Sequence, residues 1–177
     1  MDTRRLTRDA MLTATALIIF VFEAQLPPLT SIPGIKMGLA NIITVYAVFA
    51  LSPADAAGIL LCRVLLGAAV AGNLSTLMYS AAGGAMCLIS MLPLRRILTA
   101  RQIWAASVAG AAAHNLGQMA VAVAITRTPA LLAQLPVLMV SGIIAGLFTG
   151  LCAQALINRL IAKAARQGHE GSRRDPG

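Results

Sequence analysis

Charged residues are scarce in this chain, and their scarcity indicates the solvent that surrounds it. Only 11% of the 177 residues are Asp, Glu, Lys or Arg, whereas 58% are hydrophobic. This composition leaves too little polar surface to cover a water-soluble globule. The sequence therefore predicts an integral membrane protein and argues against a soluble enzyme.

Acidic residues are scarcer than basic ones, and the arrangements that they do not form exclude several reactions. The six Asp and Glu residues form no aspartate pair that would hold magnesium against a diphosphate. No glycine-rich loop ends in Lys-Ser or Lys-Thr, so the chain cannot hydrolyse a nucleotide by itself and any pumping needs a separate motor. No nucleophile, base and orienting residue stand out together, and no His or Cys spacing suggests haem or zinc. We expect no catalytic residue, no metal and no cofactor.

Cysteine and aromatic residues are few as well. The three cysteines, Cys62, Cys87 and Cys152, are too scattered for a disulfide framework, and we expect small buried hydrophobes. Aromatic residues make up only 4% of the chain, which favours close helix packing through small residues. Small residues recur at four-residue spacing in three stripes, Ala10 with Ala14, Gly67 with Ala71, and Gly142 with Gly146 and Gly150. We expect these stripes to pack the chain's own bundle, or to dock a partner where they face lipid.

Apolar residues fill the stretch from residue 10 to residue 164 with brief interruptions. One span needs about 20 mostly apolar residues. We therefore predict an all-α bundle of six spans: residues 10–26, 38–51, two within 54–92 that reverse near residues 72–76, 103–125 and 135–161. Outer loops are expected at residues 27–38 and 126–134. A single membrane domain, residues 1–165, then precedes a disordered polar tail at 166–177.

Basic residues crowd the chain ends and one short loop, although the net charge of +8 could suggest nucleic acid. The three groups are Arg4, Arg5 and Arg8; Arg95, Arg96 and Arg101; and Arg159, Lys163, Arg166, Arg173 and Arg174. Six spans put all three groups on one side, which the positive-inside rule makes cytoplasmic. Both termini are then predicted to be cytoplasmic, and no nucleic-acid partner is expected.

Polar residues at membrane depth are the candidates for function, because they are costly in a bilayer and usually face a cavity or a partner. Their estimated depths converge on the middle and outer half of the membrane, which predicts a binding pocket that opens outward. The candidate substrate-binding residues are Glu23, Lys36, Asn41, Arg63, His114, Asn115 and Gln118. The alternative is structural: an ion pair between Glu23 and Arg63, and hydrogen bonds between helices from residues 114–118.

Three stretches resemble one bacterial family. They are Leu-Pro-Pro-Leu-Thr-Ser-Ile-Pro-Gly-Ile-Lys-Met-Gly-Leu-Ala-Asn at residues 26–41, Arg-Val-Leu-Leu-Gly at 63–67 and Ala-His-Asn-Leu-Gly-Gln at 113–118. The family is labelled Gx transporter and also heptaprenyl diphosphate synthase component I. The resemblance covers nearly the whole membrane portion and implies a bacterial cytoplasmic (inner) membrane protein. The missing aspartates contradict the enzyme role implied by the second label, so no enzyme is expected.

More distantly, the size and the six spans resemble the substrate-binding S components of energy-coupling factor vitamin transporters. That resemblance implies a small-molecule ligand near the outer face, a membrane coupling subunit and partner ATPases. It also implies that Ala10 and Ala14 contact the coupling subunit. The family is similar to membrane components of flavin- and quinone-linked electron-transfer systems too.

Two functions follow from these resemblances. The first is a substrate-binding subunit of an importer, in which the loop at residues 27–38 closes over the ligand. The second is a subunit that binds quinone or anchors a redox partner without transporting. Lys36 and Arg63 against Glu23 favour an anionic or zwitterionic ligand.

Overall fold

The computed structural model describes residues 2–26, 36 and 38–174, with side chains up to residue 163. The described residues form helices and no strand. The elements are α1 (Thr3–Glu23), α2 (Asn41–Ala50), α3 (Pro53–Ala71), α4 (Leu74–Ile97), α5 (Ile103–Thr126), the short 3-10 helix η1 (Pro129–Gln134) and α6 (Leu135–Arg174). The expected loop at residues 27–38 lies mostly outside the described residues, which include only Lys36 and Gly38 of it.

Local turn chemistry sets two of the helix boundaries. The Ser52 hydroxyl accepts a hydrogen bond from the Asp55 amide at 3.1 Å, and Pro53 occupies the first turn of α3. At the other end of α3, Gly72 ends the helix with a φ of +60°, which favours glycine. Asn73 then caps α4 by accepting from the Ser75 amide at 2.8 Å. The predicted reversal near residues 72–76 is confirmed, and the turn at Ser52 lies between the spans predicted at 38–51 and 54–92.

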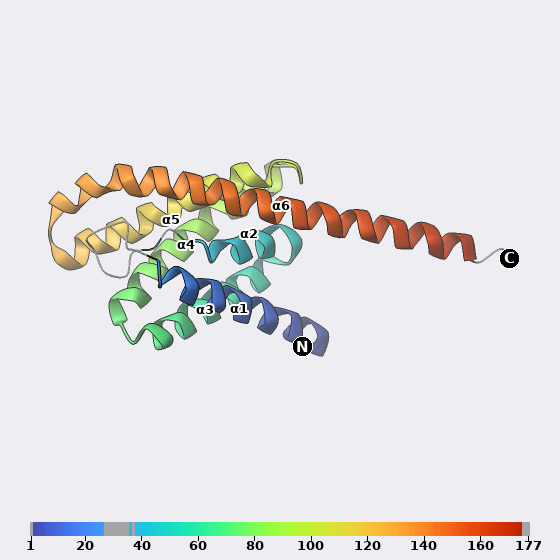
Figure 1. The fold of residues 1–177 in the computed structure, drawn as a ribbon, viewed down its shortest axis with the longest axis horizontal. Coiled ribbons are helices and arrows are strands. Elements are labelled where there is room, and N and C mark those ends of the chain that lie inside the picture. Colours follow the sequence, from blue (N-terminus) through green and yellow to red (C-terminus); the bar gives the residue numbers. More distant parts are fainter. Residues whose placement is uncertain (1, 27–35, 37, 175–177) are drawn as a thin grey trace.

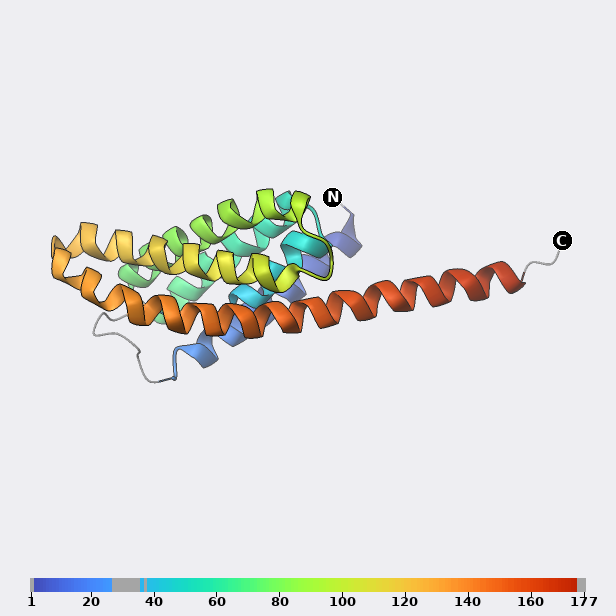
Figure 2. The same cartoon turned by 90° about the horizontal axis from the view of Figure 1, so that it is seen from above.

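Successive helices run in opposite directions along the bundle (Figures 1 and 2). The N terminus, the α2–α3 turn and the α4–α5 connection therefore lie towards one end, which we call the basic end. Arg4, Arg5 and Arg8 lie at the start of α1, and Arg95 and Arg96 lie in the last turn of α4. The first two predicted basic groups thus share one end of the molecule.

Four helical segments are long and apolar enough to cross a membrane. They are Pro53–Ala71, Leu74–Ile97, Ile103–Thr126 and Pro129–Lys163. The chain is therefore a multi-pass membrane protein. Helix α1 carries charged residues at both ends and is not among the four, and α2 is a shorter apolar helix of 10 residues. The structure thus shows six α-helices and four candidate spans among the described residues.

Helix α2 lies at the centre of the bundle, because it contacts every other α-helix. Around it, α3 packs against α1 and α4, and α5 packs between α4 and α6. Two apolar clusters fill the interior. The first includes Val48 near the end of α2, Ile59 near the start of α3 and Met91 near the end of α4, and therefore lies towards the basic end. The second includes Tyr79 near the start of α4 and Met119 in the second half of α5, and therefore lies towards the opposite end. The part of the interior between these clusters is polar.

Small residues bring α5 and α6 into close contact. A Cβ added to Gly146 would lie 2.8 Å from the Ala111 Cβ, and one added to Gly150 would lie 2.7 Å from the Trp104 Cα. Gly67 of α3 packs in the same way against the Phe20 ring of α1, with an added Cβ at 3.1 Å. These glycines of the predicted stripes therefore pack the chain's own bundle.

Two details of the structure differ from the expectations. Helix α6 continues to Arg174, so the main chain of residues 166–174 is helical instead of a disordered tail. Strong helix formers such as Ala, Lys, Arg and Gln continue past residue 161, and no proline follows before Pro176. The second difference concerns cysteine: Cys87 is buried, but Cys62 and Cys152 are exposed on the outside of the bundle. A small apolar side chain is equally compatible with lipid, so composition does not decide which way it faces.

Candidate functional site

Six of the seven candidate residues are buried, with exposed fractions between 0 and 5%. The seventh, Lys36, is half-buried. Glu23 ends α1, Asn41 begins α2, Arg63 lies in the middle of α3, and His114, Asn115 and Gln118 lie in the middle of α5. These residues come from four separate helices, and Lys36 precedes α2. We use the term buried polar layer for Glu23, Lys36, Asn41, Arg63, His114 and Gln118.

The Gln118 amide joins α5 to the segment that precedes α2. Its oxygen accepts a hydrogen bond from the Lys36 amide, and its nitrogen donates to the Lys36 carbonyl, both at 3.1 Å. This pair of bonds defines which end of the amide is oxygen. The same nitrogen also donates to Nε2 of His114. His114 is therefore neutral with its proton on Nδ1. Gln118 holds the main chain at Lys36 through both ends of its side-chain amide.

Gly38 lets this segment pass close to the buried polar layer. Its φ of +84° is a conformation that favours glycine, and an added Cβ would lie 2.7 Å from the Asn41 Nδ2 and 3.2 Å from the His114 ring. The Gly38 amide donates to the Glu23 carboxylate at 2.6 Å. Glu23 therefore binds the main chain just before α2. Among the described residues no ion pair joins it to Arg63, so the structural ion pair considered from sequence is not formed.

Several buried polar atoms of this layer have no hydrogen-bond partner of good geometry. They are Nδ2 and Oδ1 of Asn41, Nε and Nη2 of Arg63, and Nδ1 of His114. The last of these points at Gly83 of α4, where an added Cβ would lie 2.7 Å away. Each unsatisfied buried group costs about 1–3 kcal/mol. Such groups are rare in folded proteins, and several in one place indicate a missing partner.

Lys36 adds a cation to this layer. Its ammonium nitrogen lies over the Phe20 ring of α1, 3.4 Å from the ring centre, in a cation–π contact. Burial lowers the pKa of Lys36 from its usual value, and the nearby Glu23 carboxylate opposes this change. Lys36 was predicted to be a ligand-binding residue, and the structure places it beside Glu23 and within electrostatic range of Arg63.

Asn115 lies apart from the buried polar layer, although sequence grouped it there. It faces α6, where its Nδ2 donates to the Leu138 carbonyl at 2.5 Å and packs against Gly142. Further along the same contact, the Ser107 and Thr149 hydroxyls lie 3.1 Å apart. These bonds join α5 to α6. The Asn115 bond is of the kind that the structural alternative predicts, a hydrogen bond between helices from residues 114–118.

The expected partner-docking residues, Ala10 and Ala14, are exposed on α1. Met11 and Ile18 on the same helix are also exposed, at 67% and 70%. This side of α1 therefore packs against no other part of the described chain. A surface of this kind meets lipid or a partner subunit.

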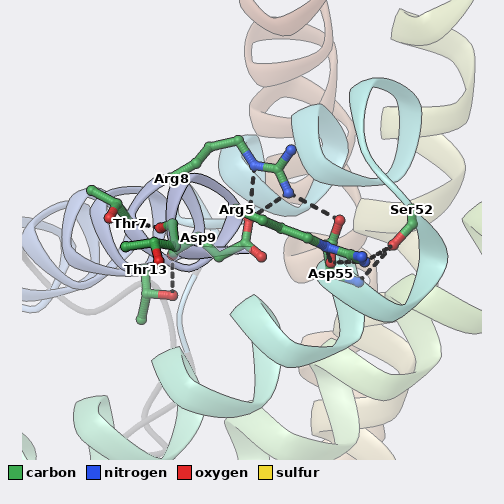
Figure 3. A network of polar contacts seen from close by, with 8 residues as sticks. Arg5, Thr7, Arg8, Asp9, Thr13, Ser52 and Asp55 are labelled. Atoms are coloured by element: carbon green, nitrogen blue, oxygen red, sulfur yellow. Dashed lines mark hydrogen bonds and ion pairs between the residues drawn. The ribbon is translucent and has the colours of Figure 1, made fainter. Parts of the chain in front are cut away.

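A second polar cluster lies at the basic end and was not predicted (Figure 3). Arg5 donates to the Asp55 carboxylate through Nε at 2.8 Å and Nη2 at 2.5 Å, and Arg8 reaches the other carboxylate oxygen at 3.0 Å. The Ser52 hydroxyl also accepts from Arg5, at 3.0 Å. This cluster ties the start of α1 to the start of α3. The charge pattern predicted that these arginines lie at one end of the molecule. It did not predict that they bind Asp55, which is 47–50 residues away in the sequence.

Sequence reasoning also missed three neighbours of the buried polar layer, namely Gly38, Gly83 and Cys87. Gly38 was visible within the stretch Gly-Ile-Lys-Met-Gly, and Gly83 is followed by a second glycine, Gly84. Adjacent glycines inside a helix indicate a close approach by another element. Nothing in the sequence distinguishes Cys87, which is buried and interacts electrostatically with Arg63.

Comparison with known proteins identifies the family. Neither the curated proteins nor the solved structures contain a match to the chain. The family model described as heptaprenyl diphosphate synthase component I matches residues 12–156. This range includes all seven candidate residues, the whole of α2 to α5, and α1 from residue 12 onward. The chain therefore belongs to the heptaprenyl diphosphate synthase component I family.

Proposed function

We propose that this protein is the substrate-binding membrane subunit of a small-molecule importer, similar to the S components of energy-coupling factor transporters. The single observation that carries the proposal is the set of buried polar atoms without partners on Asn41, Arg63 and His114. A scaffold contact satisfies its own polar groups, as the Ser107 and Thr149 hydroxyls do by bonding to each other between α5 and α6. A binding layer leaves donors and acceptors free for the ligand.

The rest of the chain supports a passive subunit. Its sequence has no nucleotide-binding loop, so import needs partner ATPases and a membrane coupling subunit. Its six acidic residues form no magnesium-holding pair, so we propose that the chain is a non-catalytic member of a family whose name refers to a synthase. The exposed face of α1 at Ala10 and Ala14 is the proposed contact with the coupling subunit.

We further propose six membrane crossings with both termini in the cytoplasm of a bacterial cell, in the inner membrane. The alternating helix directions support an even number of crossings. The basic residues at one end support the orientation, because Lys and Arg accumulate on the cytoplasmic side.

The test uses Asn41→Leu in the full-length protein reconstituted into lipid nanodiscs. Wild-type protein is equilibrated with a total small-molecule extract of the expressing cells, and retained molecules are identified by mass spectrometry. Because both polar atoms of the Asn41 side chain lack partners, Asn41→Leu should not lower the melting temperature of the ligand-free protein. It should, however, weaken retention of the ligand. Asn158→Leu, on an exposed position of α6, is the matched control and should change neither.

Two results would contradict the proposal. A large loss of stability in ligand-free Asn41→Leu would show that Asn41 is scaffold. Retention of quinone or copurification of a flavoprotein, with no saturable water-soluble ligand, would favour the redox subunit considered from sequence.

A further inference from the structure

Arg63 presents an unused hydrogen-bonding edge inside the bundle. The residue is 97% buried, and neither Nε nor Nη2 has a partner. These two nitrogens lie on the same edge of the planar guanidinium, where their N–H groups point in parallel. Such an edge matches two oxygens of one anionic group, as in bidentate arginine–carboxylate pairs. One group with two adjacent acceptor oxygens would satisfy both nitrogens.

Glu23 is the carboxylate within electrostatic range of Arg63, and it is already bound to another group. The Glu23 carboxylate accepts the Gly38 amide at 2.6 Å, at the beginning of the turn that leads into α2. The first turn of α2 has no side-chain cap of its own. Glu23 therefore supplies negative charge to the N-terminal end of this helix, where negative charge is stabilising. The two side chains lie within electrostatic range, but among the described residues no ion pair joins Glu23 to Arg63.

The other groups within electrostatic range of Arg63 supply no anion. They are Lys36 before α2, Cys87 on α4 and His114 on α5. Lys36 is a cation against the Phe20 ring, and His114 is neutral because Gln118 donates to its Nε2. The Cys87 thiol lies 3.5 Å from the Met91 sulfur in an apolar cluster. Nothing in the described part of the chain neutralises the guanidinium at close range.

The count of charges indicates which anion fits. The buried polar layer contains two cationic side chains, Lys36 and Arg63, and one acidic side chain, Glu23, so it has one more basic than acidic residue. An uncompensated charge is costly at membrane depth. A carboxylate supplies one negative charge and two oxygens. A phosphate monoester supplies about 1.5 to 2 negative charges at pH 7, more than the layer needs.

We infer that the ligand of the buried polar layer carries a carboxylate, which the Nε and Nη2 edge of Arg63 binds through two parallel hydrogen bonds. The inference rests on the proposed function and adds the chemical class of the ligand. It makes Arg63 the residue that determines specificity for acids over their neutral counterparts. Lys36 contributes charge, and Asn41 offers a donor and an acceptor to the remainder of the ligand.

The experiment measures the melting temperature of the full-length protein in nanodiscs. The small-molecule extract of the expressing cells is separated by anion exchange into an anionic fraction and a neutral-plus-cationic fraction. We expect the anionic fraction to raise the melting temperature of the wild-type protein and the other fraction to leave it unchanged. Methylation of carboxyl groups in the anionic fraction should abolish the effect, whereas treatment with alkaline phosphatase should not.

Substitutions at Arg63 assign the effect to this residue. Arg63→Lys keeps the charge but loses the two-nitrogen edge, and it should weaken binding of the active compound by about tenfold or more. Arg63→Gln loses both and should weaken it by about thirtyfold or more. Arg101→Gln, on an exposed residue of the α4–α5 connection, should bind like wild type. If Arg63→Gln fails to fold, Arg63→Lys still decides the question.

The possible outcomes separate the two proposals. Stabilisation that survives methylation of carboxyl groups, loss of the effect on phosphatase treatment, or unchanged binding in both Arg63 variants would overturn the carboxylate and leave the ligand-binding function standing. No stabilisation by either fraction would overturn the binding function itself, and the inference with it.

Discussion

Replacing Gln118 by Leu should destabilise the protein, because this side chain holds three groups at once. Its amide bonds the Lys36 N–H and carbonyl at 3.1 Å each and donates to the His114 ring. Leu has a similar size, so the change opens little space but removes all three bonds. At about 1 kcal/mol per bond the free energy of unfolding should fall by about 3 kcal/mol. In a chain of this size, that corresponds to a melting temperature lower by about 6–12 °C.

The assay is thermal unfolding of the ligand-free protein in nanodiscs, with Gln154→Leu as the matched control. Within the described part of the chain Gln154 makes one long hydrogen bond, with the Trp104 amide at 3.5 Å, so its loss should cost less than about 0.5 kcal/mol. Equal melting temperatures for the two variants would refute the reasoning, because the main chain at Lys36 would then not depend on Gln118.

Four further predictions address other parts of the molecule. Gly38→Ala should destabilise by about 1–3 kcal/mol and weaken ligand binding, since its φ is +84° and its Cβ would meet Asn41; thermal unfolding checks this, and wild-type stability would contradict it. Asp55→Asn should cost less than about 1 kcal/mol in the same assay, because its partners Arg5 and Arg8 are 49% and 40% exposed; a loss above 2 kcal/mol would show that the cluster is more than a surface ion pair. Ala14→Leu should reduce copurification of a coupling subunit while leaving ligand binding intact, and an unchanged complex would assign this face to lipid. A periplasmic phosphatase fused after Arg166 should be inactive, and activity would exclude the six-span topology.

Helix boundaries were the part of the fold that sequence predicted best. Ser52 with Pro53, and Gly72 with Asn73, act through hydrogen bonds and φ preferences within a few residues, so their effect is readable locally. The level of the buried polar layer was predictable for a similar reason, because the rise per residue converts sequence position into depth along a helix.

Contacts between helices were less predictable, because depth says nothing about the direction in which a side chain points. Asn115 and Gln118 share a helix and a level, yet the first faces α6 and the second faces Lys36. Charge was misleading in a similar way: Glu23 and Arg63 look complementary in sequence, but the Gly38 amide takes the carboxylate. Main-chain donors are present at every residue except proline and leave no sequence signal.

The shortness of α2 has a consequence for how the protein responds to its lipids. Ten residues span about 15 Å, half of a hydrocarbon core about 30 Å thick. A lipid-facing helix of that length would suffer severe hydrophobic mismatch, but in α2 only Ala50 is exposed. The outer helices contact the acyl chains. The length of α2 therefore fits the space between these helices and does not need to fit the thickness of the membrane. Bilayers of different thickness should therefore tilt α3 to α6 while the start of α2 keeps its position relative to Glu23 and Gly38.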